Sequence, residues 1–386
     1  MKKLTIFLLF FMLITGLIYG SEIRNKVDVF ISGQDGVAFY RIPALVTTNK
    51  GTLIAVCDAR IESIYDAPNN IDMAMKRSFD NGKTWTAMKK ILDYPGLEAA
   101  GDPCLLVDRE TGTVWVFYDY IIPKKGFVPS MLKDFKVADD YDKQRIIYLY
   151  AIKSEDDGET WSKPINLSST LKKDEWDYIV SAPGIGIQAR NGRLLVPTYS
   201  SRDNLKTNCC HLIYSDDHGK TWSIGGAVGK YNVEPQIVEL ADGSLMMNMR
   251  QVKNLGYRMY SISKDLGLTW SEVVDEKTLP EPGSGCQASF IRYTDVRDGH
   301  SKNRLLFSNP ASSKGRVNMT VRVSYDEGKT WQILKVLHKG PSAYSCLTVL
   351  SDGTIGILYE RGEKNLCETM TFERFNLEFL TDGKDK

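Results

Sequence analysis

Histidine is scarce in this chain, and long apolar runs are missing beyond its first twenty residues. Only four of the 386 residues are histidines, at positions 211, 218, 300 and 338. They are scattered, no HxxxH pattern or paired CxxC occurs, and we therefore expect no metal and no other cofactor. The lack of an 18-residue apolar run after residue 20 excludes a multi-pass membrane protein.

An excess of charge of either sign is missing as well. The chain has 49 lysines and arginines against 48 aspartates and glutamates. Without a basic excess there is little to neutralise a phosphate backbone, so nucleic-acid binding is not expected. The hydrophobic fraction of 42% and the charged fraction of 25% are ordinary for a globular protein.

The first twenty residues have the pattern of a targeting segment. Lys2 and Lys3 precede an apolar stretch from Leu4 to Ile18, which is shorter than a membrane span. We predict a signal peptide at residues 1–20, with an uncleaved anchor as the alternative, and the bulky Ile18 leaves the cleavage position open. We expect export to the periplasm or the exterior, with cell-surface association left open, and no stable membrane insertion after cleavage.

The seven cysteines indicate buried thiols rather than a disulfide framework. Their number is odd, two of them are adjacent, and several lie in apolar strand-like stretches. A chain of this length can bury a core without disulfides, and a free cysteine packs as a small hydrophobic residue.

An internal repeat dominates the rest of the sequence. The pattern S-x-D-x-G-x-T-W occurs five times, with copies beginning at Ser78, Ser154, Ser215, Ser263 and Ser324. Aspartate can bond backbone N–H groups two residues on, and glycine adopts a positive φ at little cost, so each copy predicts a turn between two strands. We interpret these aspartates as structural rather than catalytic or metal-binding.

A second repeat alternates with the first and predicts the fold. Short turn-and-strand segments follow Lys50, Thr111, Asn191, Asp242 and Asp352, and a looser one follows Asp298. Six such modules predict an all-β protein, a six-bladed β-propeller formed by residues 21–386 as a single catalytic domain. We expect a monomer, one short helix near residues 169–178, and a long loop over one face at residues 121–145.

Several arginines stand at the ends of predicted strands, opposite the repeated turns. Arg41 lies between apolar neighbours, Arg60 and Arg250 end strands, and Arg316 precedes one. The centre of a propeller is where such residues converge. Guanidinium groups that converge bind a carboxylate or a phosphate, because each donates a forked pair of hydrogen bonds.

The sequence resembles bacterial sialidases (exo-α-neuraminidases) over essentially the whole chain after residue 20. The repeated turns are similar to the Asp boxes of that family, and Arg41-Ile42-Pro43 is similar to its R-I-P motif. The resemblance implies roles for the matching positions. Catalysis is assigned to the nucleophile Tyr344, its activating carboxylate Glu234 and the acid/base Asp66. Substrate binding is assigned to the carboxylate clamp Arg41, Arg250 and Arg316, to Glu360 holding Arg41, to Arg60 and Asp102 at the O4 side of the sugar, and to Gln188 at the rim.

The residue types suit a substrate that carries its own carboxylate. A carboxylate nucleophile would approach that charge at a Coulombic cost, whereas a neutral phenol would not. Phenol has an ordinary pKa of about 10, so it needs a base and a positive surround. The expected activity is release of terminal α-linked sialic acid from glycans, glycoproteins or glycolipids, with retention. An intramolecular trans-sialidase, a non-catalytic sialic-acid-binding propeller and another secreted glycoside hydrolase are the alternatives.

Overall fold

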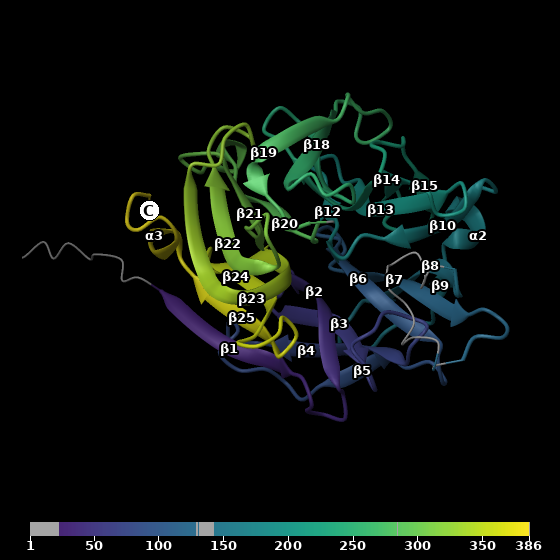
Figure 1. Ribbon diagram of the computed structural model, residues 1–386. Coiled ribbons are helices and arrows are strands. Elements are labelled where there is room, and N and C mark those ends of the chain that lie inside the picture. The colour runs from purple at the N-terminus through teal and green to yellow at the C-terminus, as the bar shows by residue number, and fades with distance from the viewer. Residues whose placement is uncertain (1–22, 129, 131–142, 284, 386) are drawn as a thin grey trace, which may run out of the picture.

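The computed structural model describes residues 23–128, 130, 143–283 and 285–385. The predicted signal peptide therefore lies outside the described residues, as does most of the predicted loop at 121–145. Within the described part almost all of the regular secondary structure is β-strand, which confirms the all-β prediction (Figure 1).

The strands form four sheets in which antiparallel neighbours follow one another along the chain. The largest sheet contains β2 (Phe39–Thr47), β3 (Leu53–Arg60), β4 (Ile71–Ser78), β5 (Lys89–Leu92), β6 (Ala99–Val107), β7 (Val114–Pro123), β8 (Arg145–Ser154), β9 (Ile165–Asn166) and β11 (Gly184–Ile185). Within it, β4 and β6 meet in parallel at a single pair, Ile71 and Ala99. This sheet is thus two antiparallel runs, β2 to β5 and β6 to β9, joined at one point, with the two-residue β11 added in parallel to β6.

Two further sheets are single runs. One contains β10 (Trp176–Ser181), β12 (Ile187–Gln188), β13 (Leu194–Arg202), β14 (Thr207–Ser215) and β15 (Ser223–Ile224). The other contains β16 (Asn232–Glu239), β17 (Leu245–Gln251), β18 (Tyr257–Ser263) and β19 (Val274–Pro280). A four-residue helix, α2 (Ser168–Leu171), precedes β10, so the helix expected near residues 169–178 is present but shorter and slightly earlier.

The last sheet joins the two ends of the chain. It contains β20 (Ser289–Thr294), β21 (Arg304–Pro310), β22 (Val317–Ser324), β23 (Ile333–Val349), β24 (Ile355–Arg361), β25 (Thr369–Phe375) and β1 (Arg24–Ile31). The 17-residue β23 pairs with β22 by its first half and with β24 by its second half. The short helices η2 (Val296–Asp298) and α3 (Leu377–Leu380) complete the described elements.

Several runs begin near the centre of the molecule, and several end near its edge. In Figure 1, β2, β6 and β20 lie toward the middle, whereas β5, β9, β15 and β19 lie at the periphery. The hydrophobic core follows this arrangement, because its clusters lie between neighbouring sheets and runs. All seven cysteines are buried and free, as the sequence predicts.

The repeated octapeptides form one recurring turn. In the first copy, Ser78 Oγ accepts the backbone N–H of Gly82 at 2.9 Å, and Asp80 accepts the backbone N–H and the hydroxyl of Thr84 at 2.9 and 2.7 Å. The same bonds recur in the other four copies. The glycine has φ = +81°, and a Cβ there would lie 2.0 Å from the Phe372 ring of the neighbouring run. The turns are therefore structural, and their glycines also lie close to side chains of a neighbouring run.

Candidate active site

Three central strands carry the same backbone distortion at the same level. Ile42 in β2, Asp102 in β6 and Glu234 in β16 all have left-handed φ angles, of 61°, 54° and 43°. Each is followed by a proline, and each lies where the strand register shifts. A bulge of this kind turns side chains away from their regular alternation. Through these bulges, residues far apart in sequence meet at one end of the central strands.

Tyr344, on β23, lies at the centre of this group. Its hydroxyl donates a hydrogen bond to Glu234 Oε1 at 2.5 Å, and Arg250 Nη1 donates to the same carboxylate oxygen at 2.8 Å and to the phenol oxygen at 3.0 Å. Tyr344 is 6% exposed and Glu234 7%. Burial raises the pKa of Tyr344 well above its ordinary value, and Glu234 adds to this effect, while Arg250 and Arg316 oppose it. The resting phenol is therefore neutral, with a proton acceptor already in contact.

Two more arginines flank the same ring. The guanidinium carbons of Arg41 and Arg316 lie 5.4 and 5.5 Å from the centroid of the Tyr344 ring. At this distance a cation is attracted to the aromatic face. Together with Arg250 they place three positive charges around one phenol; Glu360 pairs with Arg41 and Glu234 with Arg250.

Glu360, on β24, fixes the relative positions of Arg41 and Tyr344. It is fully buried, and its Oε1 accepts Arg41 Nε at 2.9 Å and the backbone N–H of Ile42 at 2.8 Å. Its other oxygen accepts the backbone N–H of Tyr344 at 3.0 Å. The Glu360 carboxylate therefore accepts hydrogen bonds from the backbone of the β2 bulge and from the backbone of β23. Glu360 thus lies where the resemblance placed it, against Arg41.

Asp66 enters the group from the loop between β3 and β4. Arg60 Nη2 lies 2.7 Å from Asp66 Oδ1 and 3.1 Å from Asp58 Oδ2, and the Asp66 side chain is 53% exposed. Burial alone would raise the pKa of Asp66, but Arg60 and then Arg41 outweigh it and lower the pKa to about 2. Asp66 is therefore ionised in the resting protein.

Three further carboxyl groups, those of Asp58, Asp102 and Asp119, lie close to one another in the neighbourhood of Asp66. Asp58 Oδ1 accepts the backbone N–H of Asp102 at 3.0 Å, and Ser181 donates its hydroxyl to the Asp102 carbonyl at 2.6 Å and its N–H to Asp119 at 2.9 Å. Burial raises the pKa of Asp58 to about 6, despite Arg60, and raises the pKa values of Asp102 and Asp119 well above their ordinary range. Asp102 and Asp119 therefore keep their protons at a pH at which Asp66 has lost its own, whereas Asp58 loses its proton near pH 6.

The sequence did not indicate Asp58, Asp119 or Ser181 as part of the site. For Asp58 a signal existed, because it stands two residues before Arg60 and so faces the same side of β3. Asp119 and Ser181 lie on β7 and β10, with no local motif, and only the packing of the runs brings them to Asp102.

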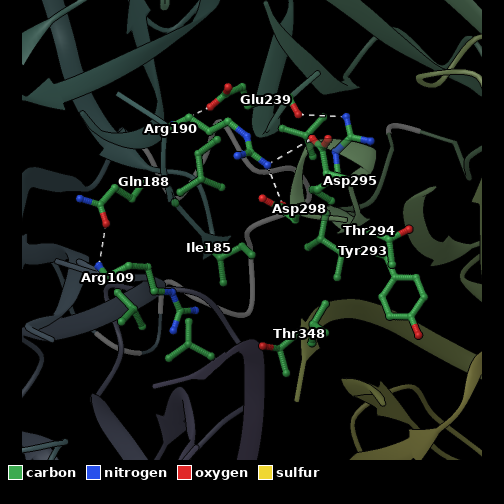
Figure 2. A pocket seen from close by; sticks show the side chains of 18 of the residues that line it. Arg109, Ile185, Gln188, Arg190, Glu239, Tyr293, Thr294, Asp295, Asp298 and Thr348 are labelled. Carbon is green, nitrogen blue, oxygen red and sulfur yellow. Dashed lines mark hydrogen bonds and ion pairs between the residues drawn. The ribbon is translucent and has the colours of Figure 1, made fainter. Parts of the chain in front are cut away.

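Gln188 is the one predicted site residue that the structure does not bring to this group. Its side chain accepts the backbone N–H of Arg109 at 2.6 Å and donates to the Gly192 carbonyl at 3.0 Å. It lines a separate cavity at the other end of the central strands (Figure 2). The remaining nine predicted residues, from Arg41 to Glu360, lie around Tyr344 or around Arg60.

The described residues were compared with the patterns of a metal site and of a membrane-spanning helix. No group of three or more His, Cys, Asp or Glu side chains within them is arranged to hold a metal ion. Among the same residues, none of the helices is both long and apolar enough to cross a membrane.

Comparison with known proteins gives a consistent answer. Residues 66–357 match the family model described as a BNR repeat-like domain. A sialidase of Bacteroides fragilis is 38% identical over 371 residues, which are 93% of this chain and 66% of that protein's length. The structure of the Hadza microbial sialidase Hz136 superposes with a TM-score of 0.80 at 34% identity, covering 92% of this chain and 69% of that one.

A second solved structure is that of an enzyme with a different activity. It is the intramolecular trans-sialidase of Ruminococcus gnavus in complex with oseltamivir carboxylate, with a TM-score of 0.75 and 26% identity, covering 92% of this chain and 98% of that one. These proteins share the arrangement of strands with the chain described above, and the family model covers most of its length. On this evidence, the chain belongs to the sialidase family.

Proposed function

We propose that this protein is a retaining exo-sialidase, a glycoside hydrolase that releases terminal α-linked sialic acid from glycans, glycoproteins or glycolipids. The observation that carries the proposal is the contact of Tyr344 with Glu234 and Arg250, at 2.5 and 3.0 Å, in a buried position surrounded by three arginines. A neutral nucleophile with a base in contact suits a substrate that carries a negative charge at the reacting carbon.

The three arginines are well placed to hold the substrate carboxylate. Arg41 and Arg316 lie on either side of the Tyr344 ring, and Arg250 contacts its hydroxyl. A carboxylate bound between them would bring the neighbouring anomeric carbon to the phenol oxygen. The same positive charges would stabilise the phenolate as it forms.

The proposed reaction has two displacements. In the first, Tyr344 Oη bonds to the anomeric carbon and gives its proton to Glu234, while the bond to the aglycone oxygen breaks and Asp66 protonates that oxygen. In the second, Asp66 takes a proton from water, the water oxygen bonds to the anomeric carbon, the bond to Tyr344 breaks, and Glu234 returns the proton to the phenol. Two inversions give net retention.

Asp66 must bind a proton before the first step, although Arg60 keeps it ionised in the resting protein. Bound substrate would bury the half-exposed Asp66 side chain and would offer Arg60 another partner, and both changes raise the pKa of a carboxyl group.

The proposal includes the architecture. The antiparallel runs from β2 to β5, β6 to β9, β10 to β15, β16 to β19, β20 to β23 and β23 to β1 are suited to be the six blades of a propeller. The long β23 would be the outer strand of one blade and the inner strand of the next. We further propose that the protein acts as a monomer after export.

An intramolecular trans-sialidase is the second candidate function. The similarity to the Ruminococcus gnavus enzyme, over 98% of that chain, favours it. It would use the same clamp and nucleophile, but an oxygen of the sugar would replace water in the second displacement. A non-catalytic binding module is less favoured, because the tyrosine and its base are both present and in contact.

One experiment separates these functions. Purified protein is incubated with α2,3- and α2,6-linked sialyllactose, and proton NMR follows the products from the first minutes. A retaining hydrolase gives the α anomer of free sialic acid before mutarotation. An anhydro sugar would identify the intramolecular route, and a β anomer appearing first would contradict the double displacement. Unchanged substrate would favour the binding module.

A further inference from the structure

A cavity of about 680 Å³ lies at the opposite end of the central strands from Tyr344. Val46, Val107, Val238 and Val349 line it, near the last residues of β2, β6, β16 and β23. Val46 is five residues beyond Arg41 on the same strand, which is about 17 Å at roughly 3.3 Å per residue. The cavity is therefore separate from the proposed active site.

The inner wall of this cavity is aliphatic. Ile185, Ile187 and Ile291 join the four valines. Ile185 is only partly buried, although it packs against three of the hydrophobic clusters. In Figure 2 it lies in the middle of the cavity, between Arg109 and Thr348. An apolar surface left open at the junction of several sheets favours the binding of an apolar body.

The rim of the cavity is charged, and most of its charges are paired. Arg190 pairs with Asp298 at 2.6 Å, and Arg297 pairs with Asp295 at 2.6 Å (Figure 2). A third arginine, Arg292, is held by Glu327 outside the lining. These arginines are neutralised within the protein.

Arg109 differs from the other rim arginines. Its Nη1 donates to the Thr47 carbonyl at 2.8 Å and to Asn49 Oδ1 at 3.2 Å, and no ion pair with a carboxylate is formed within the described part of the chain. Gln188 fixes its backbone by accepting its N–H. The cavity thus combines an aliphatic wall with a held guanidinium that has no anionic partner among the described residues.

We propose that this cavity binds a small organic acid, whose carboxylate pairs with Arg109 and whose apolar body lies on Ile185 and the surrounding valines. A cavity of this volume holds a ligand up to the size of a typical drug molecule. The site is independent of the proposed sialidase reaction, since it shares no residue with the group around Tyr344.

The test uses the full chain and two probes of the same shape. Isothermal titration calorimetry measures binding of 4-phenylbutyrate and of the uncharged 4-phenylbutanol. We expect the acid to bind with one site per chain, and at least tenfold more tightly than the alcohol, because a charge-assisted hydrogen bond is among the strong polar contacts.

Variants locate the binding. Arg109→Gln should weaken the acid at least tenfold and leave turnover of sialyllactose unchanged. Arg202→Gln, at an exposed arginine on β13 outside the cavity, is the matched control and should change neither. Val349→Thr keeps the shape of the wall but adds a hydroxyl, so it should weaken acid and alcohol alike.

Three results would overturn the proposal. They are no measurable binding of 4-phenylbutyrate at 10 mM, equal affinity of acid and alcohol, and binding that survives in Arg109→Gln but is lost in Arg316→Gln. The last result would place the acid among the arginines around Tyr344. Thermal unfolding of each variant shows that a loss of binding does not come from a loss of folding.

Discussion

Glu234 Oε1 accepts the hydrogen bond of Tyr344 at 2.5 Å, although 110 positions separate the two residues in the chain. The left-handed bulge of β16 directs Glu234 toward the ring, and Glu360 holds the backbone of Tyr344 from the other side. Because the pKa of Tyr344 is raised, the phenol keeps its proton until the substrate arrives. Proton loss to Glu234 must then accompany attack on the substrate.

Removal of the Tyr344 hydroxyl should abolish most of the turnover but leave the binding of sialic acid nearly unchanged. In Tyr344→Phe the arginines remain, so we expect the affinity for free sialic acid to change less than tenfold while kcat falls by at least about 10³-fold. Glu234→Gln should show the same division, because it removes the base. Titration calorimetry and turnover of sialyllactose provide the two measurements. A loss of binding in both variants would assign Tyr344 and Glu234 to the clamp instead.

The loss of activity in Asp66→Ala should be larger for a substrate with a poorer leaving group. Asp66→Ala should lose about 10²–10⁴-fold in kcat/KM on sialyllactose, whose leaving alkoxide needs a proton. On a methylumbelliferyl sialoside it should lose much less, because that phenolate leaves unaided. The ratio of the two losses is the quantity to be measured.

Glu62 provides the matched control for this comparison, since it is an exposed carboxylate on the same loop. Glu62→Ala should change neither rate by more than a few-fold. If Asp66→Ala were equally impaired on both substrates, Asp66 would be holding the sugar rather than donating the proton, and Glu62 would become the candidate acid.

The stability of the fold should depend on the protonation of Asp58. Its pKa is raised to about 6 in the folded protein, chiefly by burial, so the folded state binds a proton that the unfolded chain releases near pH 4. The free energy of unfolding should therefore decline as the pH rises from about 4 to 6. Asp58→Asn should reduce this slope, although the raised pKa values of Asp102 and Asp119 leave part of it.

Denaturant unfolding at pH 4, 5, 6 and 7 measures this slope in both proteins. The absolute stability of Asp58→Asn is less informative, because an amide facing Arg60 costs stability at every pH. Equal slopes in the two proteins would show that Asp58 is ionised throughout this range.

The glycine of a repeated turn should contribute to stability in two ways, through its positive φ angle and through the space it leaves for a neighbouring side chain, and the two can be measured separately. Gly82 and Gly243 have similar positive φ angles, of 81° and 86°, but a Cβ at Gly82 would lie 2.0 Å from Phe372, whereas at Gly243 it would meet nothing within 4 Å. Gly243→Ala should cost roughly 1–2 kcal/mol from the backbone alone. Gly82→Ala should cost about 1–3 kcal/mol more through overpacking. Similar costs in urea unfolding would mean that Phe372 moves aside.

The repeats made the local structure predictable. Each octapeptide encodes its own turn through the serine at its first position and the aspartate at its third, which are Ser78 and Asp80 in the first copy. The roles of the site residues from Arg41 to Glu360 were predicted through the family resemblance, whereas the sequence alone indicated only a group of converging arginines at strand ends. Asp119 escaped notice because its partner, Ser181, lies 62 positions away and no motif joins them. Gln188 was misplaced because a glycine-rich segment does not show at which end of a strand its side chain lies.

Some features depend on the whole fold. The seventeen residues of β23 pair with two different strands in succession, and no local pattern marks the change of partner. Burial raises the pKa values of both Asp58 and Asp66, and both contact Arg60, but Arg41 and Arg145 also act on Asp66 and make its net shift downward. Charges that reach a carboxyl group from distant segments can be seen only in the packed structure.

The central claim, that Tyr344 is the nucleophile, is tested most directly by trapping the covalent intermediate. A 3-fluorosialyl fluoride should form the glycosyl-enzyme and hydrolyse slowly, because the added fluorine destabilises the positive charge of both transition states. Peptide mass spectrometry after short incubation should find one sialyl group per chain, on Tyr344, and none in Tyr344→Phe. An adduct on Glu234, Asp66 or any other residue, or rapid turnover of the probe by Tyr344→Phe, would contradict the account.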